Sequence, residues 1–296
     1  MHAAAKPLFA LLAVGATAPA LANEIAFVDQ FRNVADVQTG NATLSFQSAY
    51  FSASVQVSSQ ASAVYDSATL TIGDPATGPS YALSSNDGGH SFGYQTYALP
   101  SQAAMDAQFP LSSPYTYALS NATDSASTTI QVGENRYAGA QPMLTGDSFS
   151  ALQGMDSAKA LTLSFNAFDE VPGADAQFVF FSLFDDTTST ALFPVSFGPR
   201  TTAGVTLDAG LLLPGHAYSF ELIDSVRVNV PDADTDFQAQ LAFDLRTNGQ
   251  FTTAMSLPVP EPSATALWLA GLLALSRASR KRQDRRYRRH WPPRRV

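Results

Sequence analysis

The residues best suited to catalysis or metal binding are few in this chain of 296 residues. It has no cysteine and four histidines, of which His2 and His290 lie near the two ends. His90 and His216 each follow a glycine directly, within a turn-like sequence. A histidine-based zinc site needs three or more ligands, and no His-Glu-x-x-His spacing occurs. We therefore expect His90 and His216 to be exposed turn residues, and we predict no metal or cofactor site.

Two pairs of adjacent carboxylates, Asp169–Glu170 and Asp185–Asp186, are the next candidates for acid–base chemistry. A glycosidase places its acid and its base on opposite sides of a cleft, so neighbours in one turn fit poorly. We expect these four residues to be solvated turn residues. Serine and aspartate are abundant, but no Gly-x-Ser-x-Gly nucleophile elbow is present. We predict that the chain is not an enzyme.

Three alternating aspartates, Asp232, Asp234 and Asp236, have the spacing that opens an EF-hand calcium loop. The loop pattern then fails, because Phe237 stands where glycine is needed and Phe243 where glutamate is needed. A looser Ca²⁺ site at the three aspartates stays open.

The last forty residues carry a pattern of three parts. Val259-Pro260-Glu261-Pro262-Ser263 comes first, and an apolar segment at 264–275 follows. Ten of the chain's 17 lysines and arginines then lie between Arg277 and Arg295. A short polar signal, a short apolar helix and a basic stop can hold a chain in a bilayer while exposing a cleavable site. The basic block should stay in the cytoplasm, which places the bulk of the chain outside.

This pattern resembles the PEP-CTERM sorting signal, which is recognised by exosortase, a membrane-embedded transpeptidase-like enzyme of Gram-negative bacteria. The resemblance implies processing at the Pro-Glu-Pro motif and delivery to the cell surface or the extracellular matrix. The tail at 283–296 is longer than the family pattern, which leaves open whether the signal is fully removed. The residues that carry the resemblance are the sorting motif (Val259, Pro260, Glu261, Pro262, Ser263) and the basic stop (Arg277, Arg280, Lys281, Arg282).

A lasting C-terminal anchor helix is the alternative interpretation of the same segment. Residues 264–275 make 12 residues. That is about 18 Å of helix at ~1.5 Å per residue. A bilayer core is ~30 Å thick and generally needs ~20 apolar residues. The segment therefore favours a transmembrane helix that stays only transiently in the inner membrane.

The N-terminus fits the same route. Lys6 provides a charged start, residues 8–14 an apolar core, and Ala20-Leu21-Ala22 a small-x-small cleavage site. This order is typical of a secretory signal peptide. We expect signal peptidase to cleave after Ala22, so that the exported chain starts at Asn23.

Removal of both signals leaves residues 23–259, with 23 acidic and six basic residues and a net charge of −17. Such an acidic surface argues against binding to nucleic acid or to an anionic membrane, and leaves cations and basic partners open. Without cysteine there is no disulfide framework. Stability must come from a packed core, which a segment of this length can build as one or two domains.

Alternating apolar and polar residues predict that this region is all-β. Every odd position from Phe237 to Leu245 is apolar, and residues 161–165 and 226–230 alternate in the same way. Clusters of Gly, Pro, Asn and Asp separate the runs. We expect short strands in one or two antiparallel β-sandwich (immunoglobulin-like) domains, with one short helix near 101–108.

A weak internal repeat favours two modules. Residues 105–109 lead to Tyr115-Thr116-Tyr117, and residues 207–211 lead through a Pro-Gly turn to 218–220, an offset of 102 to 103 residues. The second copy resembles the strand after the Pro-Gly turn in fibronectin type III-like modules. We expect modules at 23–142 and 143–256, between the signal peptide at 1–22 and the sorting signal at 257–296. One larger sandwich with two similar hairpins is the alternative.

Three tyrosines in looser sequence, Tyr94, Tyr97 and Tyr137, could stack on a sugar ring. Two hypotheses follow. The favoured one is a non-enzymatic, secreted surface or extracellular-matrix protein processed by signal peptidase and exosortase. The alternative is a carbohydrate-binding β-sandwich protein associated with exopolysaccharide.

Overall fold

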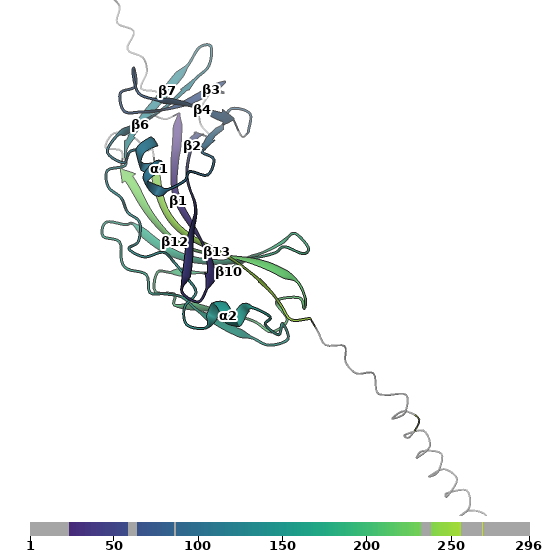
Figure 1. Ribbon diagram of the computed structural model, residues 1–296. Helices are drawn as coiled ribbons and strands as arrows, with labels where there is room; N and C mark the ends of the chain where they lie inside the picture. The colour runs from purple at the N-terminus through teal and green to yellow at the C-terminus, as the bar shows by residue number, and fades with distance from the viewer. Residues whose placement is uncertain (1–23, 59–63, 86, 232–237, 256–267, 269–296) are drawn as a thin grey trace, which may run out of the picture. The chain divides into compact units, whose positions relative to one another are not determined.

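The computed structural model describes residues 24–58, 64–85, 87–231, 238–255 and 268 (Figure 1). Within these residues the chain forms thirteen β-strands and two short helices, so the prediction of an all-β fold is confirmed. Described residues up to Ala254 belong to one compact unit, and Met255 begins a second one. The elements are β1 (Ile25–Gly40), β2 (Thr43–Val57), β3 (Ser67–Ile72), β4 (Ser80–Ser85), β5 (Ser91–Gln95), α1 (Gln102–Gln108), β6 (Pro114–Ser120), β7 (Ser125–Gln131), α2 (Ser148–Leu152), β8 (Leu161–Ser164), β9 (Ala176–Asp185), β10 (Thr190–Pro199), β11 (Gly204–Leu207), β12 (Ala217–Pro231) and β13 (Gln238–Thr252).

Eleven of these strands form one sheet in the order β10-β9-β12-β13-β1-β2-β5-β4-β3-β6-β7, and β8 pairs with β11 in a second, small sheet. The paired strands in the described residues are antiparallel except β1 and β13, which run parallel from Phe27–Gln238 to Val37–Asn248. The first and last strands of the described region thus lie side by side at the centre of the sheet. This parallel pair departs from the purely antiparallel arrangement expected from the turn signals.

Four strands are much longer than the short strands expected from the sequence. β1 has 16 residues, and β2, β12 and β13 have 15 each. In β13 the alternation continues beyond Leu245 through Thr247, Gly249 and Phe251, which share one face of the strand. Because a threonine and a glycine hold core-side positions there, the sequence pattern looks as if it ends early.

Two hydrophobic cores pack on the same face of the large sheet. Core 1 gathers apolar residues from β1 to β7, from α1, and from Val226 and 239–245 of β12 and β13. Core 2 gathers residues from α2, β8, β9 and β11, together with Tyr218, Phe220 and Phe251 of the same two strands. Figure 1 shows α1 beside the strands of core 1 and α2 near the other end of β13. Strands β12 and β13 therefore contribute to both cores.

Of the two short helices, α1 has a capping hydrogen bond, whereas α2 was not expected from the sequence and has no side-chain cap. Ser101 caps α1 by accepting a hydrogen bond from the N–H of Ala104, so the helix predicted near 101–108 is confirmed. α2 follows Asp147 and buries Phe149 and Leu152 in core 2. No helix among the described residues is long and apolar enough to cross a bilayer. Apart from Trp268, the apolar segment 264–275 lies outside those residues.

The opposite face of the central strands is covered by neither core, and we call it the open face. It consists of the odd-numbered residues of β1 from 27 to 37 and of β12, and the even-numbered residues of β9 and β13. The pairing register puts these residues side by side in rows across the sheet, which builds the candidate site described next.

Candidate functional site

The predicted processing sites lie outside the described residues. This holds for the two small residues of the signal-peptide cleavage site, the sorting motif and the basic stop, and for the three aspartates of the looser calcium site. Within the described residues, no group of three or more His, Cys, Asp or Glu side chains could hold a metal ion. The residues concerned are Ala20, Ala22, Val259, Pro260, Glu261, Pro262, Ser263, Arg277, Arg280, Lys281, Arg282, Asp232, Asp234 and Asp236.

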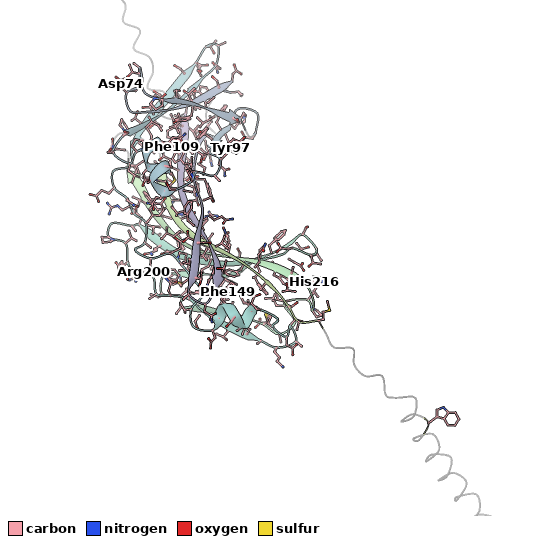
Figure 2. The ribbon with its side chains drawn as sticks, in the orientation of Figure 1. Asp74, Tyr97, Phe109, Phe149, Arg200 and His216 are labelled. Carbon is pink, nitrogen blue, oxygen red and sulfur yellow. The ribbon has the colours of Figure 1, made fainter. Side chains whose placement is uncertain are left out.

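The two candidate histidines differ in their surroundings. His90 is exposed, as expected. His216 (labelled in Figure 2) lies in its turn but is half-buried, and its Nδ1 is 2.8 Å from Oδ2 of Asp185. Asp185 is 3% exposed and accepts hydrogen bonds from the N–H groups of Thr187 and Thr188. The expectations that His216 is an exposed turn residue and that Asp185 is a solvated one were therefore wrong, since their contact joins two turns.

The other carboxylates in the adjacent pairs fit the expectation. Asp169, Glu170 and Asp186 are exposed. Glu170 pairs with Arg200 at 2.6 Å, and Asp186 accepts a hydrogen bond from Ser219 at 3.0 Å.

Two of the three candidate tyrosines are engaged in core 1. Tyr94 packs against Tyr81 and Phe109, with ring centroids 5.1 and 6.3 Å away, and Tyr137 meets Phe243 edge-on at 5.4 Å. Tyr97 is 95% exposed (Figure 2). Of the three, Tyr97 therefore has the most exposed ring, and it follows the end of β5.

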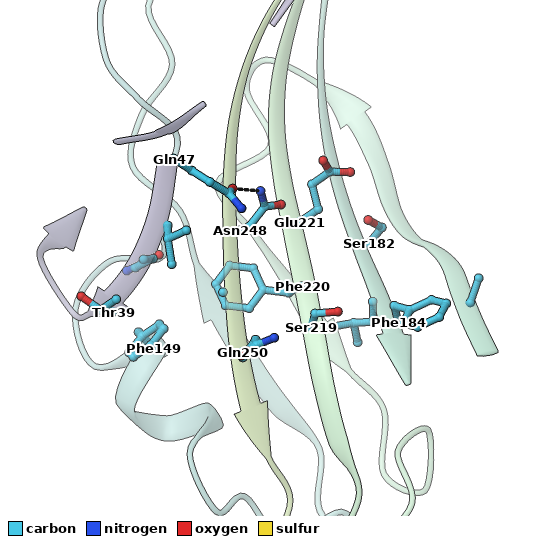
Figure 3. Close-up of a pocket in the computed structure, with 15 residues that line it drawn as sticks. Thr39, Gln47, Phe149, Ser182, Phe184, Ser219, Phe220, Glu221, Asn248 and Gln250 are labelled. Atoms are coloured by element: carbon cyan, nitrogen blue, oxygen red, sulfur yellow. Dashed lines mark hydrogen bonds between the residues drawn. The ribbon is translucent and has the colours of Figure 1, made fainter. Parts of the chain in front are cut away.

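A groove of about 700 Å³ lies at one end of the open face (Figure 3). A row of cross-strand neighbours lines it, with Ser182 of β9, Glu221 of β12, Asn248 of β13 and Val37 of β1. Gln47 of β2 extends the row, since Asn248 Nδ2 donates a hydrogen bond to Gln47 Oε1 at 2.8 Å (Figure 3). Phe149 of α2 and Phe220 of β12 also line the groove, so most of its surface is apolar, with amide and hydroxyl groups and one carboxylate set into it (Figure 3).

The next row of the open face completes the groove. Phe184 of β9, Ser219 of β12 and Gln250 of β13 are cross-strand neighbours, and Ala191 of β10 pairs with Phe184. The Phe184 side chain is 39% exposed. The groove therefore combines aromatic and other apolar surface with a few polar groups, which is the composition of many ligand sites.

A partly buried ion-pair network lies beside the groove. Arg246 donates from Nε to Asn33 at 2.7 Å, and from its two terminal nitrogens to Glu221 and Asp244 at 3.0 Å each. Asp244 is 2% exposed and also accepts a hydrogen bond from Ser225 at 2.6 Å. Burial acts to lower the pKa of Arg246, but the surrounding acidic groups, Asp244 foremost, raise it. The guanidinium therefore stays charged and holds both carboxylates in place.

Arg227 continues this polar strip along the open face. Its guanidinium lies 5.0 Å from the centre of the Phe31 ring and 3.8 Å from Asp244. Farther along, burial raises the pKa of Asp29 to about 6, against the lowering effect of Arg227. A second hollow of about 310 Å³ lies there, lined by Phe31 and by residues of β2 and β5.

Aromatic residues border the open face on its other side. The ring of Phe197 in the edge strand β10 lies 5.3 Å from that of Phe178 and 4.7 Å from that of Phe180, both in β9. Phe197 is 56% exposed. The open face thus passes from aromatic side chains at the edge to amide and charged groups at the centre.

Sequence reasoning did not find this groove or its ion pairs. Arg227, Asp244 and Arg246 occupy the polar phase of two runs whose alternation was recognised, so the pattern indicated that they face away from the core. Their meeting depends on the register between β12 and β13, which the pattern does not contain. Comparisons with known proteins add no assignment, because no family model and no curated protein sequence matches this chain.

Proposed function

We propose that this chain is a non-enzymatic protein exported across the inner membrane of a Gram-negative bacterium and processed by exosortase at Pro260-Glu261-Pro262. The single observation that carries the proposal is the order of motif, short apolar segment and basic block at the C-terminus. A small-x-small site after an apolar N-terminal segment supports export. The destination is the cell surface or the extracellular matrix, with a membrane-anchored intermediate.

The exported region in this proposal consists of immunoglobulin-like β-sandwich modules. The presence of two separate hydrophobic cores on β-structure supports that interpretation. In the absence of disulfides, the two cores supply the stability that a protein needs outside the cell.

Substitution of the motif in the native host tests the processing step. We expect Glu261→Ala to leave the full C-terminal segment in place and to move the protein into the membrane fraction. Pro258→Ala changes a proline just before the motif and is the matched control, for which normal processing is expected. Equal processing of both variants would refute recognition of the motif.

A second candidate function is binding of carbohydrate, and the groove on the open face favours it. The amide and hydroxyl groups within its mainly apolar lining offer hydrogen bonds to a sugar, and the exposed ring of Phe184 offers a stacking surface. Affinity electrophoresis through gels that contain polysaccharide tests this function. Migration that no polysaccharide retards would contradict it.

A further inference from the structure

We infer that the groove on the open face binds an uncharged, hydroxyl-rich glycan chain, with the Gln47–Asn248 amide pair as its anchor. The inference rests on the second candidate function and adds the class of ligand and the residues that contact it.

The amide pair is oriented for two neighbouring hydroxyl groups. Asn248 Nδ2 donates a hydrogen bond to Gln47 Oε1 at 2.8 Å, so each side chain holds the other in place. Within the described part of the chain, Gln47 Nε2 and Asn248 Oδ1 have no further protein partner. One donor and one acceptor therefore remain free side by side (Figure 3). A sugar hydroxyl both donates and accepts, so two adjacent hydroxyls match this pair.

A stacking surface lies across the groove from the amide pair. Phe184 lines the groove with its side chain 39% exposed, and its cross-strand neighbour is the small residue Ser219. The apolar C–H face of a sugar ring can cover such a ring while its hydroxyls turn to Gln250 and Asn248. The lining residues extend across the sheet from Gln47 of β2 to Ala191 of β10, so several linked sugars could lie along them.

The charges select against an acidic glycan. The cation next to the groove, Arg246, donates one hydrogen bond from each of its three nitrogens, and two of the partners, Glu221 and Asp244, are carboxylates that offset its charge. A ligand carboxylate would find no free cation among the lining residues and would face the carboxylate of Glu221. The exported region as a whole carries a charge of −17, which repels a polyanion at longer range.

The test is affinity electrophoresis of the protein recovered from its host, in gels containing glucomannan or mixed-linkage β-glucan as neutral probes and alginate or polygalacturonate as acidic ones. We expect retardation by a neutral probe, unchanged by added salt, and none by the acidic probes. We expect Asn248→Ala and Phe184→Ala each to weaken the apparent affinity by about tenfold, the loss of roughly one good contact.

Gln240→Ala is the matched control. Gln240 lies on the same face of β13 and donates to Asn229 of β12 at 3.3 Å, so it forms a similar amide pair outside the groove. We expect this variant to bind as the native protein does, and all three variants to keep the native melting temperature to within a few degrees.

The possible results distinguish a wrong assignment of the groove from a wrong assignment of the carbohydrate-binding function. Retardation by a neutral probe that Asn248→Ala and Phe184→Ala leave intact would overturn the assignment of the groove. Retardation by acidic probes alone, abolished by salt, would overturn the class of ligand while keeping carbohydrate binding. Absence of retardation in every gel would refute the carbohydrate-binding function itself.

Discussion

The buried carboxylate of Asp224 allows a sharp test of the packing between the two cores. Asp224 is fully buried in β12, between Leu222 of core 2 and Val226 of core 1. The amide nitrogen of Gln177 donates to both of its oxygens at 3.1 Å. Burial raises the pKa of Asp224 to about 6. We predict that Asp224→Asn stabilises the protein at neutral pH, because the amide keeps an acceptor for Gln177 and removes the charge.

The sign and size follow from the two protonation equilibria. Below pH ~3 the carboxyl is protonated in both the folded and the unfolded chain, so it adds no pH dependence. Between pH ~4 and ~6 the unfolded chain releases its proton first, and stability falls as pH rises. A shift of about two pKa units corresponds to ~3 kcal/mol. This net shift already includes the hydrogen bonds from Gln177, which act to lower the pKa of Asp224. A gain of up to about 3 kcal/mol is therefore expected above pH 6.

Urea unfolding of both proteins at pH 4, 5 and 7 measures this effect. The advantage of Asp224→Asn should be near zero at pH 4 and full at pH 7. Asp66→Asn makes the same change at an exposed position and should stay within about 0.5 kcal/mol of the native protein at each pH. A variant that is less stable than the native protein at pH 7, or whose advantage does not depend on pH, would refute the reasoning.

Three further substitutions test other parts of the structure. Burial acts to raise the pKa of Asp185, but hydrogen bonds from His216 and Thr188 outweigh it and hold the pKa below its ordinary value. Because its pKa is lower in the folded than in the unfolded chain, ionised Asp185 stabilises the fold above the unfolded pKa, and this stabilisation is lost as the pH falls. Asp185→Asn should therefore lower the melting temperature at pH 6 but not at pH 3. An equal decrease in melting temperature at both pH values would contradict this. Arg246→Met leaves the buried Asp244 without its main partner and should cost about 3 kcal/mol in urea unfolding; a cost below about 1 kcal/mol would show the network to be unimportant. Gly249→Ala places a Cβ 2.4 Å from the Phe220 ring and should cost about 1–3 kcal/mol by the same measurement, whereas an unchanged midpoint would mean that the ring moves freely aside.

Local alternation was enough to predict the class of fold and the faces of individual strands. In β13 the odd positions from Ala239 to Leu245 enter core 1, and in β12 Val226 does the same, as the pattern indicated. The capped helix α1 was also predictable, since Ser101 precedes a short run of helix-forming residues. These features depend on neighbours within one turn or one strand. The boundary between modules near 142 stays a prediction.

Features that depend on distant partners were not predictable. The parallel pairing of β1 with β13 joins segments more than 200 residues apart, as in the bond between Asn33 and Arg246, and no local signal marks it. The burial of Asp185 arises because the turn before β12 folds over the turn after β9. The groove follows from the same long-range register, since Gln47, Glu221 and Asn248 come from three different strands. Sequence alternation predicted the face of the strand on which such residues lie, but not which residues of other strands lie beside them.

The intact mass of the protein recovered from its own host tests the central claim most directly, because it determines both ends at once. We predict a species that starts at Asn23 and ends between Val259 and Pro262, with or without added mass at the new C-terminus. A species that retains the sequence through Val296 would contradict the account, because the C-terminal segment would then be a lasting membrane anchor instead of a sorting signal.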